Sequence, residues 1–408
     1  MNRMEDYLIV NIGLLATPTG RAALKGDAQA GVNFTKNAAI AFSKGKITFV
    51  GSIQDAPKAE EIVNAGGRLV TPGLVDSHTH LVFGGFRQHE FEKKIAGISY
   101  LDILNAGGGI LSTVEATRLA SYDELYSKSV AFLNEMLAHG TTTVEIKSGY
   151  GLNLDTELLQ LQVINDLAKS YEVVPTFMGA HAIPKEHKDN PDAYVEHLID
   201  YVLPIVSSRK MAVFCDVFCE NSVFSVPASR KILKAAKEHG LLPKIHADEI
   251  VPIGGAELAA EIGAVSAEHL LTSSEAGLSN MADKGVIAVL LPATSFYLDK
   301  DYARARDMID KGIPVAIASD FNPGSSPSYN MQLVLNLACL KLKLTPAEAL
   351  TAATLNSAAA IGLAARKGSI EVGKDADIVI WDAPDLNFLF YRFGNNQVFE
   401  SIKMGWYA

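Results

Sequence analysis

Residues 73–80 read Gly73-Leu74-Val75-Asp76-Ser77-His78-Thr79-His80, an apolar run that ends in two histidines. Side chains two positions apart on a strand point to the same face, with Cα atoms about 6.5 Å apart. Both imidazoles can therefore reach one metal ion. A chance pair in a surface loop is the alternative, but an unpaired imidazole pair after a buried strand would be unfavourable. The stretch predicts a metal site near the end of a strand.

From about residue 70 onward, a short apolar strand followed by an amphipathic helical segment recurs. Continuous apolar strands are expected where helices cover a parallel sheet. Eight such units predict a (β/α)₈ TIM barrel. A doubly wound open sheet is the alternative, but its polar residues would gather near one switch point and not at nearly every strand end. The predicted strands are Leu74–His80, Thr141–Ser148, Val173–His181, Ala212–Glu220, Leu242–Glu249, Ala264–Leu270, Val286–Pro292 and Pro314–Asp320.

The two flanks are β-rich and lack this periodicity. Ala38–Phe42 and Ile47–Gly51 surround a Lys-Gly turn, a hairpin signature, and Gly368–Trp381 contains a turn followed by a strand. We predict one small β-sandwich domain built from both chain ends, residues 1–66 and 366–408, with the barrel between them at residues 67–365.

Composition limits the function further. The 408 residues are 48% hydrophobic, and 36 basic against 46 acidic side chains give a net charge of −10. Nucleic acids and anionic membranes demand a basic face, so neither is an expected partner. Three cysteines, an odd number, fit a reducing cytoplasm. No uncharged apolar run reaches the ~18–20 residues of a membrane helix. We expect a cytoplasmic protein that acts on a small molecule.

Further histidines and acids follow other predicted strands. His246 and Glu249 end the fifth strand, His269 ends the sixth and Asp320 ends the eighth. Each is weak evidence alone, but a barrel gathers these strand ends into one mouth. Three imidazoles and a carboxylate suit Zn²⁺ or Fe²⁺ with a position left open for water, and ligand type does not choose between the two ions.

With His246, His269 and Asp320, the stretch Pro72–His80 resembles the amidohydrolase superfamily, as do Leu344–Thr354 and Gly373–Asp377. The resemblance covers essentially the whole chain. It implies the barrel-plus-sandwich fold and metal ligation by His78, His80, His246 and Asp320. The fourth strand ends in Cys219-Glu220 without a lysine that could bridge two metals, which favours one divalent ion.

A closer similarity is to the imidazolonepropionase family of histidine degradation. It implies that a metal-activated water opens the ring of 4-imidazolone-5-propanoate to give N-formimidoyl-L-glutamate, and it suggests a homodimer. The family pattern has a glycine where this chain has Ser222. The similarity is carried by Ser99–Ile103, Gly107–Arg118, Glu145–Leu152, Gly179–Ala182, His246–Glu249 and Ser319–Gly324.

The resemblance also implies roles for individual residues. Arg87 would grip the propionate through two hydrogen bonds, although an arginine here could equally be solvated. Gly107–Gly109 lacks the Lys-Ser/Thr ending of a phosphate loop, so we interpret it as a flexible lid. The expected catalytic residues are Glu249, His269 and Asp320. The expected substrate contacts are Arg87, Tyr150, His181, Glu249, Asn322, Gly324 and Ser325.

Two other functions stay open at this point. A cytosine- or guanine-type deaminase would share the metal ligands but not the segment Lys147–Gly151. A non-catalytic barrel used for binding or assembly would typically have lost ligands, whereas this chain keeps each of them. Turnover of imidazolone propionate compared with cytosine and guanine would distinguish a deaminase from the favoured function. Metal analysis that found an empty site would favour the non-catalytic barrel.

Overall fold

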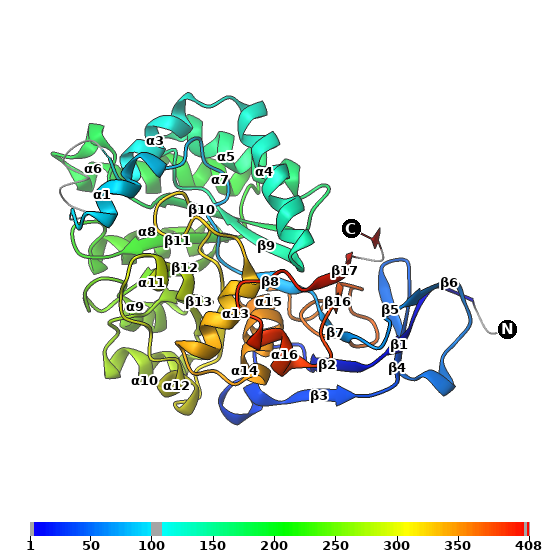
Figure 1. The fold of residues 1–408 in the computed structure, drawn as a ribbon. Coiled ribbons are helices and arrows are strands. Elements are labelled where there is room, and N and C mark those ends of the chain that lie inside the picture. Colours follow the sequence, from blue (N-terminus) through cyan, green and yellow to red (C-terminus); the bar gives the residue numbers. More distant parts are fainter. Residues whose placement is uncertain (1–3, 99–107, 404–405, 408) are drawn as a thin grey trace.

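The computed structural model describes residues 4–98, 108–403 and 406–407. The motif Ser99–Ile103 and Gly107 of the predicted lid lie outside these residues. Eight parallel strands form one sheet in sequence order (Figure 1). The strands are β8 (Leu74–Asp76), β9 (Thr141–Lys147), β10 (Val173–Ala180), β11 (Phe214–Cys219), β12 (Leu242–Ala247), β13 (Ser266–His269), β14 (Ile287–Leu290) and β15 (Val315–Ile317).

The first and last strands of this sheet meet just beyond their ends. Thr79 and Phe321 form a parallel bridge, in which the His80 amide donates to the Phe321 carbonyl at 2.8 Å. The Asp320 amide likewise donates to the His78 carbonyl at 3.1 Å. These bonds close the sheet, so the predicted barrel is confirmed. They also bring segments about 240 residues apart, each with metal-ligand candidates, to one point.

All eight predicted strands are present, but each of them ends earlier at its carboxyl end than predicted. The strand predicted over Leu74–His80 stops at Asp76, so His78 and His80 follow the strand instead of lying on it. There the backbone leaves the ladder, and the Asp76 carboxylate accepts from the Ser319 amide at 3.0 Å. Hydropathy alone does not reveal where ladder bonds give way to such contacts.

Helices cover the outside of the barrel, and their ends follow ordinary capping chemistry. In α8 the hydroxyl of Ser225 caps the first turn, Pro227 lies in that turn, and Ile232 and Ala236 face the barrel. None of the helices in the described residues is long and apolar enough to cross a membrane. The α-helices are α1 (Phe91–Ile95), α3 (Ile110–Leu119), α4 (Tyr122–Ala138), α5 (Leu154–Leu167), α6 (Pro191–His197), α7 (Leu203–Ser208), α8 (Val226–Glu238), α9 (Gly255–Ile262), α10 (Glu275–Lys284), α11 (Pro292–Tyr297), α12 (Ala305–Asp310), α13 (Met331–Leu340), α14 (Pro346–Thr351), α15 (Ser357–Ala360) and α16 (Leu386–Tyr391).

Two further sheets form the second domain, where strands from the two chain ends lie side by side (Figure 1). One has the order β5-β4-β1-β6, the other β18-β17-β16-β7-β2-β3. Their shared core includes Ile9, Phe42 and Ile380, as predicted for a composite β-sandwich. The strands are β1 (Glu5–Ile12), β2 (Leu14–Pro18), β3 (Val32–Thr35), β4 (Ala38–Ser43), β5 (Lys46–Ser52), β6 (Ala59–Asn64), β7 (Leu69–Pro72), β16 (Ile378–Trp381), β17 (Val398–Lys403) and β18 (Trp406–Tyr407).

The domain boundaries remain our proposal. The strand β7 pairs with β16 and β2, so it lies in the sandwich although it follows residue 66.

Candidate active site and metal centre

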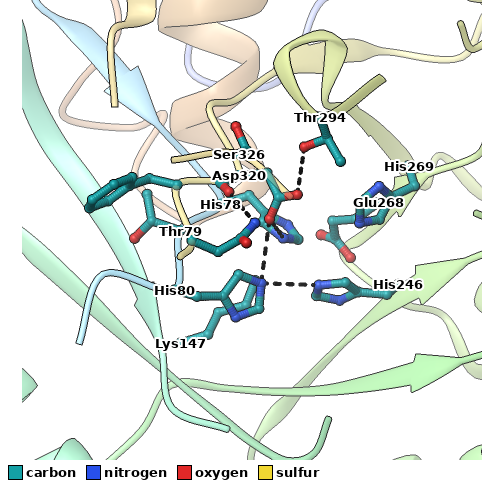
Figure 2. A network of polar contacts seen from close by, with 12 residues as sticks. His78, Thr79, His80, Lys147, His246, Glu268, His269, Thr294, Asp320 and Ser326 are labelled. Atoms are coloured by element: carbon teal, nitrogen blue, oxygen red, sulfur yellow. Dashed lines mark hydrogen bonds and ion pairs between the residues drawn. The ribbon is translucent and has the colours of Figure 1, made fainter. Parts of the chain in front are cut away.

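Four of the predicted ligands converge at the carboxyl ends of the barrel strands (Figure 2). The Nε2 atoms of His80 and His246 lie 3.4 Å apart, and Asp320 Oδ1 lies 3.5 Å from Nε2 of both His78 and His80. Ligand atoms about 2.0–2.1 Å from a tetrahedral ion are separated by about 3.4 Å from one another. The four side chains therefore have the spacing of a mononuclear site, and each is at most 3% exposed.

The chemistry of the donor atoms fits a cation as well. Both ring nitrogens of His78 are buried without a hydrogen-bond partner within the described part of the chain. The facing Nε2 atoms of His80 and His246 can form a hydrogen bond only if one of them carries a hydrogen atom. A divalent cation would satisfy His78, His80 and His246 together, because all three rings are ligands in their neutral form. Their nitrogens lie within 4.8 Å of one another.

Burial and neighbouring charges keep His78 and His80 neutral and ready to bind, whereas the Asp216 carboxylate raises the pKa of His246 against the effect of burial. Burial lowers the pKa of His78 and His80 well below the usual range, and Lys147 and His181 respectively lower them further. Burial raises the pKa of Asp320 to about 6, although Thr294 donates to its Oδ2 at 2.6 Å. A bound cation would lower the pKa of Asp320 again, since positive charge favours the carboxylate.

Beneath the ligands, the barrel interior holds a network of charged side chains instead of the usual branched apolar layers. Lys147 Nζ lies 2.8 Å from both Glu145 Oε1 and Asp216 Oδ2. Lys244 Nζ lies 3.2 Å from Glu145 Oε1 and 3.5 Å from Glu268 Oε1. All five side chains are fully buried, so each charge depends on its partners in the network.

This network contacts His246, one of the predicted metal ligands, directly. Asp216 Oδ1 lies 3.1 Å from His246 Nδ1 and accepts from the His246 amide. The contact directs Nε2 of His246 toward the metal site, because Nδ1 carries the proton that Asp216 accepts. Burial would raise the pKa of Asp216, but the charges of His246 and Lys147 hold it well below its usual range.

We expect the Asp216→Asn variant to bind its metal about 10- to 100-fold more weakly, because the tautomer and ring angle of His246 are no longer fixed. Metal affinity measured by competition with a chromophoric chelator tests this. Asp307→Asn on α12, far from the network, is the control and should bind metal as the wild type does. An unchanged affinity in Asp216→Asn would contradict the role of Asp216.

Glu249 and His269 lie beside the ligands. Nε2 of His269 is 3.6 Å from Glu249 Oε2, and the His269 ring centre is 5.3 Å from that of His246. Burial and the charge of Asp320 raise the pKa of Glu249 to about 8, so its carboxyl can hold a proton at neutral pH. Burial lowers the pKa of His269 well below its usual range, so its ring is neutral.

Three predicted substrate contacts line the opposite side of the site. The ring of His181 stacks on His80 with centres 4.7 Å apart, and its Nδ1 donates to the Gly149 carbonyl at 3.0 Å. The Tyr150 ring lies 5.2 Å from His181. Arg87 is close enough for its charge to lower the pKa of His181, which burial chiefly lowers to about 3. These positions are compatible with the predicted contacts to substrate, which stay a proposal.

The loop after β15 brings the remaining predicted residues together as one turn. The side chain of Asn322 accepts from the amides of Gly324 and Ser325 and donates to the Asp320 carbonyl. A Cβ atom at Gly324 would lie 1.0 Å from Nη2 of Arg87, so the guanidinium packs directly on this glycine. The prediction that Asn322, Gly324 and Ser325 contact substrate stays a proposal.

Several residues at this end of the barrel have left-handed backbone. Asp248, His269 and Asp320 have φ of 49°, 68° and 53°, a region that costs L-residues roughly 1 kcal/mol or more. Strained backbone conformations of this kind tend to occur at functional sites, where the surrounding structure holds side chains in place. Ser222, which stands where the family pattern has glycine, has φ of 68°, so the position needs the conformation that glycine adopts most easily.

Sequence reasoning missed the buried network. Asp216 sits in the middle of an apolar strand, where an acid must be paired, and this signal could have marked it. The same holds for Glu145, Lys147 and Lys244. Thr294 carries no such signal, since its position next to Asp320 depends on how α11 packs.

A family model described as the amidohydrolase family matches residues 69–406, so the chain belongs to the amidohydrolase family. The imidazolonepropionase of Brevibacillus brevis is 55% identical over 354 residues, which are 86% of this chain and 84% of that protein. The imidazolonepropionase of Alkaliphilus metalliredigens is 50% identical over 411 residues, 98% and 97% of the two chains. Within its family, the chain groups with these imidazolonepropionases and is a hydrolase.

Solved structures support the fold alone. The guanine deaminase of E. coli has a TM-score of 0.75 to this structure at 14% identity, with 98% of both chains covered.

Proposed function

We propose that this chain hydrolyses the ring amide of 4-imidazolone-5-propanoate to give N-formimidoyl-L-glutamate, with one divalent metal ion, Zn²⁺ or Fe²⁺. The observation that carries the proposal is that close relatives over nearly the whole chain are imidazolonepropionases, while the four ligand candidates lie together. A homodimer and a cytoplasmic location remain further proposals from the sequence.

The metal would be held by His78, His80, His246 and Asp320, and when bound it would supply an activated water at neutral pH. Asp320, whose carboxylate lies beside His78 and His80, would be placed to accept the proton of that water. Glu249, with its pKa raised to about 8 by burial first and then by Asp320, can give a proton to the departing ring nitrogen. His269 can donate a hydrogen bond to the developing oxyanion.

The opposite side of the site would bind the rest of the substrate. His181 and Tyr150 would contact the ring, and Arg87 would hold the propionate. Nε of Arg87 is buried and has no hydrogen-bond partner among the described residues, so this donor is left unused by the protein itself. A guanidinium grips a carboxylate through two parallel hydrogen bonds.

Metal removal tests the proposal as a whole. Dialysis against dipicolinate should abolish hydrolysis of 4-imidazolone-5-propanoate, and one equivalent of Zn²⁺ or Fe²⁺ should restore it, because the water is activated only when the ion is bound. Ring absorbance measures the rate, and elemental analysis gives the metal content. Cytosine and guanine serve as control substrates. Turnover of either in place of the imidazolone would overturn the assignment.

The Arg87→Met variant should raise KM about 10- to 100-fold with little change in kcat, because a charge-assisted carboxylate contact contributes roughly 1.5–3 kcal/mol. Steady-state kinetics on 4-imidazolone-5-propanoate measure both constants. Arg392→Met on the sandwich side serves as the control. A fall in kcat at constant KM would place Arg87 in the chemical step instead of in binding.

A further inference from the structure

Glu90 is a buried carboxylate away from the metal ligands, at a point where three segments meet. It ends η3 (Gln88–Glu90), directly before α1, and is 1% exposed. Its Oε1 accepts from the Gly109 amide, just before α3, at 2.6 Å. Its Oε2 has no hydrogen bond within the described residues and lies 3.7 Å from Lys94 Nζ. A buried carboxylate needs such a cation nearby.

Lys94 joins this carboxylate to the substrate side of the site. Its Nζ donates to the Gly324 carbonyl at 2.8 Å, so its charge is fixed on the loop that follows β15. The Lys94 side chain is 24% exposed, so the surrounding protein covers it only in part. Burial and the nearby charge of Arg87 lower the pKa of Lys94, which indicates that the two cations are neighbours.

Arg87 packs against the same glycine. Its guanidinium packs on Gly324, where a Cβ would lie 1.0 Å from Nη2. No acidic side chain within the described residues forms an ion pair with Arg87. Arg87 and Lys94 together carry two positive charges against the single negative charge of Glu90. Counted over the residues that the structure describes, the cluster therefore has one uncompensated positive charge, which one carboxylate of a ligand would neutralise.

We propose that Lys94, held in place by Glu90, is a positioning and specificity residue for the carboxylate of the substrate. It fixes the Gly324 peptide on which Arg87 rests, and its ammonium adds a second positive charge beside the guanidinium. This proposal rests on the proposed function, since it assumes that the carboxylate of an imidazolone or a similar ring lies at Arg87. A merely structural Glu90–Lys94 pair would change stability but not discriminate between charged and neutral ligands.

Binding of 3-(imidazol-4-yl)propanoate and of its uncharged amide, measured by calorimetry on the metal-loaded enzyme, tests the proposal without turnover. We expect Lys94→Met to bind the carboxylate about tenfold more weakly and the amide as the wild type does, because one charged contact is lost. Lys94→Arg should restore most of the affinity. Lys93→Met, an exposed neighbour on α1, is the matched control and should change neither affinity.

Lys94→Gln, whose amide can still donate to the Gly324 carbonyl, provides a second variant in case Lys94→Met does not fold, and it should also weaken binding of the carboxylate selectively. Equal losses for the acid and the amide, or no loss for either, would overturn the role of Lys94. Turnover by the wild type separates this result from the proposed function. Selective loss of carboxylate binding without imidazolone hydrolysis would refute the proposed function alone, whereas hydrolysis with unchanged binding in Lys94→Met would refute this inference alone.

Discussion

The His80→Asn variant is expected to lose its metal ion and to retain less than about 0.1% of the wild-type kcat/KM. Nε2 of His80 faces both His246 and Asp320, so removing it takes away a donor near the centre of the ligand set. Outer-sphere partners of a metal ligand already contribute about 10- to 100-fold, and a ligand itself contributes more. Without the ion, no activated water forms at neutral pH.

Elemental analysis and steady-state kinetics on the same preparation check this expectation. The control is His239→Asn, because His239 is exposed at the end of α8 and far from the ligands. It should keep full metal content and activity. A His80→Asn protein that holds one equivalent of metal and turns over at more than a tenth of the wild-type rate would remove His80 from the ligand set.

The Glu249→Gln variant is expected to keep its metal and to lose about 10²- to 10⁴-fold in kcat, the range typical of a lost general acid or base. Glutamine keeps the size of the side chain and can still contact His269, but it cannot deliver a proton to the departing nitrogen. In the wild type, activity should fall as the pH rises through the pKa of Glu249, because the protonated acid is then lost. The variant should lack this alkaline limb.

A pH profile of kcat for both proteins, together with metal analysis, measures the effect. Glu261→Gln is the matched control, since Glu261 lies on the surface of α9 in an ion pair with Arg230. Near wild-type kcat in Glu249→Gln would exclude proton transfer by Glu249. Loss of metal from this variant would instead make Glu249 a part of the ligand set.

Much of the fold could be predicted because it depends on local patterns. Apolar runs such as Val173–Ala180 are long enough to be buried strands, and the helical segments between them leave a parallel barrel as the favoured arrangement. The hairpin of β4 and β5 follows from a turn whose Lys44 and Gly45 both have positive φ. The ends of strands were less predictable, because ladder bonds stop where tertiary contacts begin.

The clustering of the predicted ligands could also be predicted, since His78 and His80 lie two residues apart and the barrel brings all strand ends together. Other features depend on tertiary structure. The sequence alone did not indicate that Asp216 would contact His246, or that Arg87 and Lys94 would both contact Gly324. These contacts join residues 30 to more than 200 positions apart. Hydropathy and residue spacing report local structure, whereas the partners of a buried charge are set only when the strands have closed into the barrel.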